Sequence, residues 1–238
     1  MSTEHSLSAP TYAPVMAEAQ NYMRWVLDQF RGELGKSVLE VGIGHGGYSA
    51  HMPPDTQYWG LDIDPEIVAN ARANFPHRDF FCADITAADF PDRLGHLAPD
   101  SILCANVIEH IEDDRLAVTN LLHILKPGGR LLLLVPAIPA LYNDLDRLAG
   151  HFRRYTRSRL TAAIPLEICT IKRMHFFNSI GALGWYANKL KRHHSIENAN
   201  VSAQVRFFDR YVLPISKAAD RLLAGSFGQS LIAVVRKS

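Results

Sequence analysis

Glycines are concentrated in a short segment that follows an apolar run. The run Ser37–Val41 is followed by Gly42, Gly44, Gly46 and Gly47, which satisfy the loop patterns G-x-G-x-x-G and G-x-G-x-G. Glycine lets a backbone approach a ligand closely, and the amide groups at the start of a following helix are free to donate hydrogen bonds. Either match alone also fits a tight turn that binds nothing. The pattern predicts a nucleotide-like ligand against Gly42 and Gly44.

Two acidic residues indicate the class of ligand. Glu40 lies two residues before Gly42, where a carboxylate suits a cationic ligand better than a pyrophosphate. S-adenosyl-L-methionine (SAM) is such a ligand, because it carries an amino group and a sulfonium. Asp62 ends the next apolar run, and an acid at that place accepts hydrogen bonds from ribose hydroxyls. A nicotinamide-dependent oxidoreductase also uses the second acid, so Asp62 does not separate the two classes, whereas Glu40 favours SAM.

These residues require elements that place them at one edge of a sheet. Apolar runs and helical patterns alternate along the chain, which indicates an α/β fold with a mostly parallel sheet and helices on both faces. Asp64 and Pro65 predict the cap and first residue of a helix that ends near Phe75. We expect strands over 37–41, 57–62, 80–85, 101–107, 130–136, 169–177 and 230–235, and helices over 15–30, 48–52 and 113–125.

Five segments between Val38 and Pro136 follow the order and spacing of one family, and together they resemble the class I SAM-dependent methyltransferases. The segments are 38–46, 60–64, 83–85, 106–111 and 125–132. The resemblance implies a Rossmann-like, seven-stranded, mostly parallel sheet whose last strand lies antiparallel beside the fifth. It also implies SAM as the cofactor and S-adenosyl-L-homocysteine (SAH) as its product.

The resemblance assigns cofactor contacts within these segments. It places Glu40 near the amino end of SAM, Asp62 near the ribose, Asp84 near the adenine amino group and Asn106 beside the methyl donor. His45 and the short segment after it depart from the family, which has a longer helix there, so methionine binding at that point stays open. The full predicted set is Glu40, Gly42, Gly44, Asp62, Ile63, Asp84, Ile85 and Asn106.

Further segments are similar to one bacterial subgroup of small-molecule methyltransferases. They are Gly-His-Phe-Arg-Arg-Tyr-Thr at 150–156, residues 227–231, and Asn21, Tyr22 and Trp25 before the glycine loop. The subgroup implies a small-molecule acceptor without identifying it.

Two histidines are the candidate catalytic residues. Methyl transfer is a substitution at the sulfonium carbon, and a hydroxyl acceptor must also lose a proton, for which histidine is the commonest base. His110 follows the fourth predicted strand and His151 follows the fifth, at the edge where loops build the site of an open α/β sheet. Each histidine also fits a supporting role, as a surface residue or as a hydrogen-bonding group that orders a loop.

A basic cluster near His151 suggests a contact with the acceptor. Arginine side chains suit carboxylates and phosphates, although a solvated helix start paired with Asp144 and Asp146 fits the same residues. The predicted substrate-binding set is Tyr22, Trp25, Tyr142, His151, Arg153, Arg154 and Tyr155.

We expect four parts along the chain. They are an N-terminal tail and cap helix (1–35), a SAM-binding core (36–175), a lid or acceptor-site insertion (176–227) and a final core strand (228–238). The insertion is too long for a simple connection and is rich in aromatic residues, which also fits core packing. With the first helix, it is predicted to form apolar walls around the acceptor and exclude water.

The composition of the chain limits the kinds of partner that it is expected to bind. A formal net charge of +1 over 238 residues gives no global signature of nucleic-acid binding. We expect no transmembrane segment, and the first residues lack the features of a signal peptide. Cys82, Cys104 and Cys169 form no C-x-x-C motif, which is typical of reduced thiols in a cytoplasmic protein. No metal-ligand spacing stands out, so we expect no metal; the oligomeric state stays open.

The sequence therefore predicts a SAM-dependent methyltransferase that acts on a small molecule. Oxygen is the favoured acceptor atom, nitrogen is next and carbon last. Two alternative functions are an NAD(P)-dependent oxidoreductase and a SAM-binding protein without catalysis. The oxidoreductase does not explain Glu40 or the segment 106–110.

Overall fold

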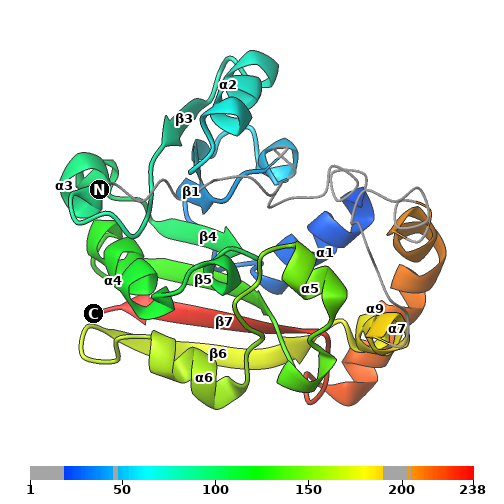
Figure 1. Ribbon diagram of the computed structural model, residues 1–238. Helices are drawn as coiled ribbons and strands as arrows, with labels where there is room; N and C mark the ends of the chain where they lie inside the picture. Colours follow the sequence, from blue (N-terminus) through cyan, green and yellow to red (C-terminus); the bar gives the residue numbers. More distant parts are fainter. Residues whose placement is uncertain (1–18, 45–47, 190–202, 204) are drawn as a thin grey trace, which may run out of the picture.

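A seven-stranded sheet forms the centre of the molecule (Figure 1). The computed structural model describes residues 19–44, 48–189, 203 and 205–238. The strand order is β3-β2-β1-β4-β5-β7-β6, and β7 pairs antiparallel with both β5 and β6 while the other neighbours pair in parallel. The predicted fold class is thus confirmed. The strands are β1 Ser37–Val41, β2 Gln57–Asp62, β3 Asp79–Cys82, β4 Ser101–Ala105, β5 Arg130–Pro136, β6 Cys169–Phe177 and β7 Ser230–Lys237.

Helices cover both faces of this sheet, because successive side chains of a strand point to opposite faces. In β5, Leu131 and Leu133 pack in one apolar layer with α4, while Leu132 and Leu134 pack in the other with α1. The α-helices are α1 Gln20–Gln29, α2 Pro65–Asn74, α3 Phe90–Leu94, α4 Asp114–Ile124, α5 Asp144–Leu148, α6 Arg157–Ala163, α7 Ser179–Lys189 and α9 Leu213–Leu223. The shorter turns are η2 Ser49–His51, η3 Gly95–Leu97, η4 Ile108–His110, η5 Pro139–Leu141 and the π-helical η6 Phe208–Val212.

Two strands end earlier than predicted. β3 stops at Cys82 instead of residue 85, and soon afterwards the Asp84 carboxylate accepts hydrogen bonds from the Thr86 amide and hydroxyl and forms a turn. β4 stops at Ala105 instead of residue 107, because Asn106 adopts a left-handed conformation with φ of 54°. That residue redirects the chain into η4, which carries part of the candidate site. The helix predicted over 48–52 is only the single turn η2.

Two carboxylates accept hydrogen bonds that connect α1, α7 and α9, the helices near the carboxyl end of the sheet (Figure 1). Asp209 accepts hydrogen bonds from the first amides of α1, at 3.2 Å from Asn21 and 2.7 Å from Tyr22. Asp220 of α9 likewise accepts hydrogen bonds from the amides of Asn178 and Ser179 at the start of α7. α1, α7 and α9 are therefore linked into one helical layer.

The structure describes only some of the residues in the four predicted parts. The first helix was expected from residue 15; residues 15–18 lie outside the described part of the chain, and α1 begins at Gln20. The expected boundary at 175/176 falls inside β6, which continues to Phe177. Residues 190–202 of the expected lid are outside the description as well. Among the described helices, none has the length and hydrophobicity needed to cross a membrane.

Candidate active site

The glycine loop leaves β1 in a conformation that requires glycine. Gly42 has φ of +73°, and a Cβ atom on it would lie 2.4 Å from Cγ2 of Val107. Its amide donates a hydrogen bond to the carbonyl of Leu61 at 2.8 Å. Gly44 has φ of +48°, and its amide donates to Oδ2 of Asp62 at 3.1 Å. The loop is thereby held against the end of β2; Gly46 and Gly47 lie outside the described residues.

Glu40 is a buried carboxyl group with one unused oxygen. Oε2 accepts a hydrogen bond from the Tyr58 hydroxyl at 2.6 Å, whereas Oε1 has no hydrogen-bond partner among the described residues. Burial raises the pKa of Glu40 to about 8, although the hydrogen bond from Tyr58 opposes this rise. A cation beside Oε1 would compensate the burial of the charge. The residue therefore fits the ammonium group of SAM.

Asp62 closes the same edge one strand further along. It is 8% exposed, and it accepts hydrogen bonds from the amides of Gly44 and Asp64, each at 3.1 Å. A carboxylate has about four lone-pair sites, which suits additional hydrogen bonds from ribose hydroxyls. Ile63 beside it is 47% exposed, so it offers an apolar surface to a flat ring.

The remaining predicted cofactor residues lie at neighbouring strand ends. Asp84 is exposed just after β3, and Ile85 is buried, with its carbonyl accepting a hydrogen bond from Asn120 at 2.8 Å. Asn106 is exposed at the end of β4, and its amide donates to the carbonyl of Leu134. Since the order is β3-β2-β1-β4, residues Asp84, Asp62, Glu40 and Asn106 follow one another along a single edge.

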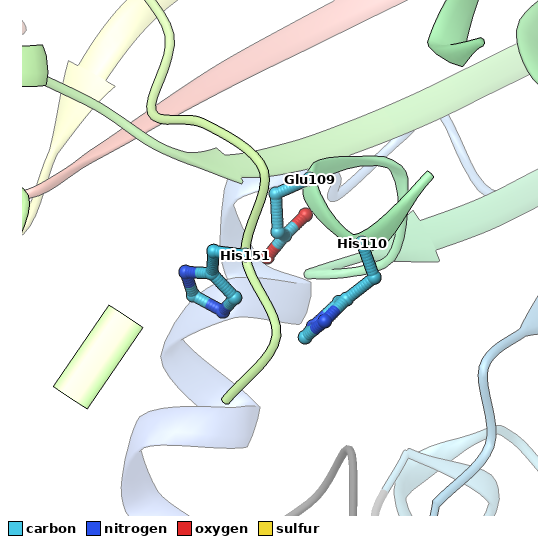
Figure 2. Close-up of side chains that lie close together, drawn as sticks. All are labelled: Glu109, His110 and His151. Atoms are coloured by element: carbon cyan, nitrogen blue, oxygen red, sulfur yellow. The ribbon is translucent and has the colours of Figure 1, made fainter. Parts of the chain in front are cut away.

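Beyond Asn106, three side chains form what we call the histidine cluster: Glu109 and His110 of η4, and His151 from the loop after α5 (Figure 2). Their candidate ligand atoms all lie within 4.8 Å of one another. The imidazole rings meet edge to face, with centroids 4.6 Å apart. A backbone hydrogen bond from the Phe152 amide to the Glu109 carbonyl, at 2.8 Å, ties the two segments together.

Burial shifts the pKa values of two residues in the histidine cluster. It raises the pKa of Glu109 to about 7 and lowers the pKa of His110 to about 4, to which the neighbouring His151 contributes. Glu109 is completely buried, and neither of its carboxylate oxygens has a hydrogen-bond partner in the described part of the chain. His110 Nδ1 is buried near the backbone of Ala149 and Gly150 without forming a hydrogen bond of normal geometry.

Asp146 orients His151. Nδ1 of His151 lies 2.9 Å from Oδ1 of Asp146, and a carboxylate can only accept a hydrogen bond. Nδ1 therefore carries the proton, and the lone pair of the neutral ring is on Nε2. Burial alone would raise the pKa of Asp146, but hydrogen bonds from His151 and Arg154 outweigh it and hold that pKa below its usual value. The indole of Trp185 in α7 also donates to this carboxylate at 3.2 Å.

The structure separates the predicted substrate-binding residues into two groups. Tyr142 lies beside the cluster, because its hydroxyl donates to the carbonyl of His151 at 2.7 Å. Arg154 and Tyr155 are 2% and 0% exposed, so they belong to the interior rather than to an acceptor surface. Arg153 forms a 2.8 Å ion pair with Asp114, so its charge already has an acidic partner within the protein. The alternative in which Asp146 pairs with this basic cluster accounts for Arg154, whereas the pair of Arg153 with Asp114 joins segments that the sequence does not bring together.

Tyr22 and Trp25 also lie mainly in the interior. The Trp25 ring is 5% exposed and packs 4.2 Å from that of Phe177. Burial raises the pKa of Tyr22 to about 12 despite a hydrogen bond with Ser230. Sequence reasoning did not assign Glu109 or Trp185 to the site, and it named Asp146 only as a possible partner of the basic cluster and not as the residue that orients His151. The Asn143–Asp146 spacing was the available signal for Asp146, since these two side chains form a capping box at α5.

Comparisons with known proteins find similarity to methyltransferases. Residues 39–133 match a family model described as a methyltransferase domain. The chain is 29% identical over 141 residues, 54% of its length, to demethylmenaquinone methyltransferase of Chlorobaculum tepidum. It is 32% identical over 107 residues, 44% of its length, to trans-aconitate 2-methyltransferase of Methylobacterium radiotolerans. The chain spans 57% and 39% of the length of these two relatives.

A solved structure resembles the whole fold. Phosphoethanolamine N-methyltransferase 2 of Haemonchus contortus in complex with SAM aligns with a TM-score of 0.60 and 12% identity, covering 95% of this chain and 58% of that one. At this identity the likeness concerns the fold alone. The family match favours SAM over the nicotinamide cofactor of the rival oxidoreductase.

Proposed function

We propose that this chain, whose residues 39–133 match a methyltransferase domain, is a class I SAM-dependent methyltransferase that transfers the methyl group of SAM to an oxygen of a small-molecule acceptor. The observation that carries the proposal is the pairing of His151 with Asp146 at the end of the sheet where the cofactor residues gather. Asn106 joins the two regions, because it ends β4 and directly precedes the segment of η4.

The proposed reaction needs little from the protein beyond alignment and proton transfer. A lone pair of the acceptor oxygen forms a bond to the methyl carbon, the carbon–sulfur bond breaks, and its electron pair stays on sulfur to give SAH. The hydroxyl proton passes to Nε2 of His151, whose Nδ1–H is held by Asp146. A neutral amine needs no base before attack, so an oriented imidazole favours a hydroxyl acceptor over nitrogen.

The helical layer supports a small, enclosed acceptor site. Trp185 places α7 against Asp146, and Lys189 at the end of α7 donates to the carbonyl of Ala140 at 2.6 Å. α7 therefore reaches over the loop that carries His151, and a cover of this kind excludes water from methyl transfer. The relatives named for demethylmenaquinone and trans-aconitate favour a metabolite acceptor. Three free cysteines fit the proposed cytoplasmic location.

Transfer of a labelled methyl group tests the proposal. SAM with a ¹³C-methyl group is incubated with the chain and a panel of hydroxylated aromatics, quinols, carboxylic acids and amines, and products are analysed by NMR. The proposal predicts an O–¹³CH₃ signal. A product with N–¹³CH₃ or C–¹³CH₃ instead would contradict oxygen transfer, and SAH binding without any product would favour a non-catalytic SAM-binding protein.

A pair of variants links that transfer to the histidine. His151→Gln should lower turnover by roughly 10²–10⁴-fold, the usual contribution of a positioned base, while SAH affinity stays unchanged. His123→Gln is the matched control, since this histidine is exposed on α4. Equal turnover in the two variants would remove His151 from the reaction.

A further inference from the structure

We infer that the histidine cluster, Glu109, His110 and His151, is a binding site for a divalent transition-metal ion such as Zn²⁺. Each of the three residues offers one ligand atom, and these atoms lie within 4.8 Å of one another. Two imidazoles and one carboxylate suit zinc, cobalt or ferrous iron, whereas magnesium and calcium prefer oxygen ligands throughout. Figure 2 shows the three side chains converging from η4 and from the loop that crosses it.

Glu109 is the strongest reason for a bound cation. Its side chain is 0% exposed, and both carboxylate oxygens are without hydrogen-bond partners among the described residues. A buried carboxyl group normally has such partners or is paired with a cation. The guanidinium of Arg154, which acts electrostatically on Glu109, does not pair with it, because Arg154 is bonded to both oxygens of Asp146 at 2.9 and 3.0 Å. A metal ion would supply the missing partner.

His151 is oriented as a metal ligand usually is. A ligating histidine commonly donates its second ring N–H to a carboxylate, which fixes the ring and directs the other nitrogen at the metal. Here Nδ1 lies 2.9 Å from Asp146, so the lone pair of Nε2 is free for coordination. Asp146 is itself held by Arg154, by Trp185 and by the amide of Asn143 at 3.0 Å. The orienting carboxylate is thus rigid.

The backbone keeps the ligands close. Glu109 and His110 are adjacent in η4. Phe152, the residue after His151, donates a backbone hydrogen bond to the carbonyl of Glu109. Atoms that bind one ion at about 2.0–2.2 Å lie at most roughly 4.4 Å apart. In a tetrahedral site the ligand atoms lie about 3.4 Å apart. The atoms here lie within 4.8 Å of one another, so binding an ion requires the side chains to move together by up to about 1.4 Å.

Three protein ligands leave a coordination position open, as in catalytic metal sites. His110 and His151 are partly exposed, so this position faces outward from the buried Glu109. If the proposed function holds, the open position would take the acceptor oxygen. A metal lowers the pKa of a bound hydroxyl, so the proton would leave to solvent before transfer, and His151 would then act as a metal ligand in place of its role as the base. This last step rests on the proposed function, whereas metal binding itself does not.

Cobalt(II) titration of the full chain, stripped with a chelator, tests the site. The visible absorption of Co²⁺ reports its ligands, and we expect one equivalent to bind and to be displaced by Zn²⁺. Glu109→Gln and His151→Gln should each abolish the saturable signal. Asp146→Asn should weaken binding by about 10–100-fold, the usual effect of losing the carboxylate that orients a ligand. SAH affinity is measured for each variant to establish that it is folded.

Two controls separate this site from others. His123→Gln should leave Co²⁺ binding unchanged, and so should joint replacement of His193 and His194 by Gln, which lie outside the described residues. Absence of stoichiometric Co²⁺ binding by the wild-type chain would overturn the inference, as would a signal that survives in folded Glu109→Gln and His151→Gln. Labelled methyl transfer is measured separately, so failure of the metal site and failure of the proposed function are distinguishable.

Discussion

Nδ1 of His151 lies 2.9 Å from Oδ1 of Asp146, and this contact joins the loop that carries His151 to the helix α5 that precedes it. The same carboxylate accepts a hydrogen bond from Trp185 of α7 at 3.2 Å. Arg154, 1% exposed in its side chain, completes the arrangement with a 2.9 Å ion pair. The orientation of the candidate catalytic ring therefore depends on a buried carboxylate shared with the covering helix.

Removal of the buried cation should destabilise the fold strongly. Arg154→Met leaves Asp146 buried without its guanidinium, and loss of one partner of a buried pair costs about 3–5 kcal/mol. Chemical denaturation measures the change in the free energy of unfolding. Arg147→Met is the control, because its pair with Asp144 is exposed and is worth about 0–1 kcal/mol. Similar losses in both variants would contradict a structural role for Arg154.

The ribose contact predicted for Asp62 can be tested through SAH affinity. Asp62→Ala should weaken binding by roughly 1–3 kcal/mol, since charge-assisted hydrogen bonds to the hydroxyls are lost. Calorimetric titration gives the dissociation constant, and Asp55→Ala, an exposed acid just before β2, serves as the control. A folded Asp62→Ala protein that binds SAH as tightly as the wild type would exclude this residue from the cofactor site.

Glu40 should make SAH binding depend on pH. Burial raises the pKa of this carboxyl group to about 8 in the free protein, so below that pH the group holds a proton that the ammonium of SAH displaces. Binding then releases a proton, and affinity should rise with pH between 6 and 7.5, by up to about tenfold per unit. The ligand's own amino group, with a pKa near 7.7–8.0, stays charged over most of this range.

The comparison that checks this effect is Glu40→Gln against Glu66→Gln, which changes an exposed acid at the start of α2. Glu40→Gln should bind SAH more weakly at pH 7.5 and with a much flatter pH profile. Tyr58 and Asp62 are the ionisable groups that act on the pKa of Glu40. Both groups are unchanged in the two variants, so a difference between the variants reports Glu40 itself. An unchanged slope in Glu40→Gln would place the titrating group elsewhere.

Hydrogen exchange tests the proposed cover. SAH and an acceptor together should protect amides in α1 and α7. Asp209 joins α1 to η6, and Asp220 joins α7 to α9, so the helices of the cover are linked. Mass spectrometry of proteolytic fragments measures this protection. Protection confined to the glycine loop, with none in α1 or α7, would rule the cover out.

The sequence could bring the predicted cofactor residues to one edge of the sheet because their signals are local. Gly42, Glu40 and Asp62 each lie within a few residues of a strand end, and parallel strands bring their carboxyl ends to one edge. Strand ends were less certain. β4 stops early because Asn106 takes a left-handed conformation, which an apolar run does not reveal.

The acceptor half was harder because its interactions join distant segments. Arg154 and Tyr155 read as an exposed basic cluster, yet their partners Asp146 and Asp114 bury them. Trp185 reaches Asp146 from 39 residues away. Glu109 lies inside a segment that resembles the family, but its complete burial, without a hydrogen-bond partner among the described residues, is a property of packing that no spacing shows.

A crystal structure with SAH and the acceptor bound is the most direct test of the central claim. The account predicts SAH along Asp84, Asp62, Glu40 and Asn106, with an acceptor oxygen either about 2.6–3.2 Å from Nε2 of His151 or bound to a metal ion in the histidine cluster. An acceptor bound with its reacting atom away from both His110 and His151 would contradict it.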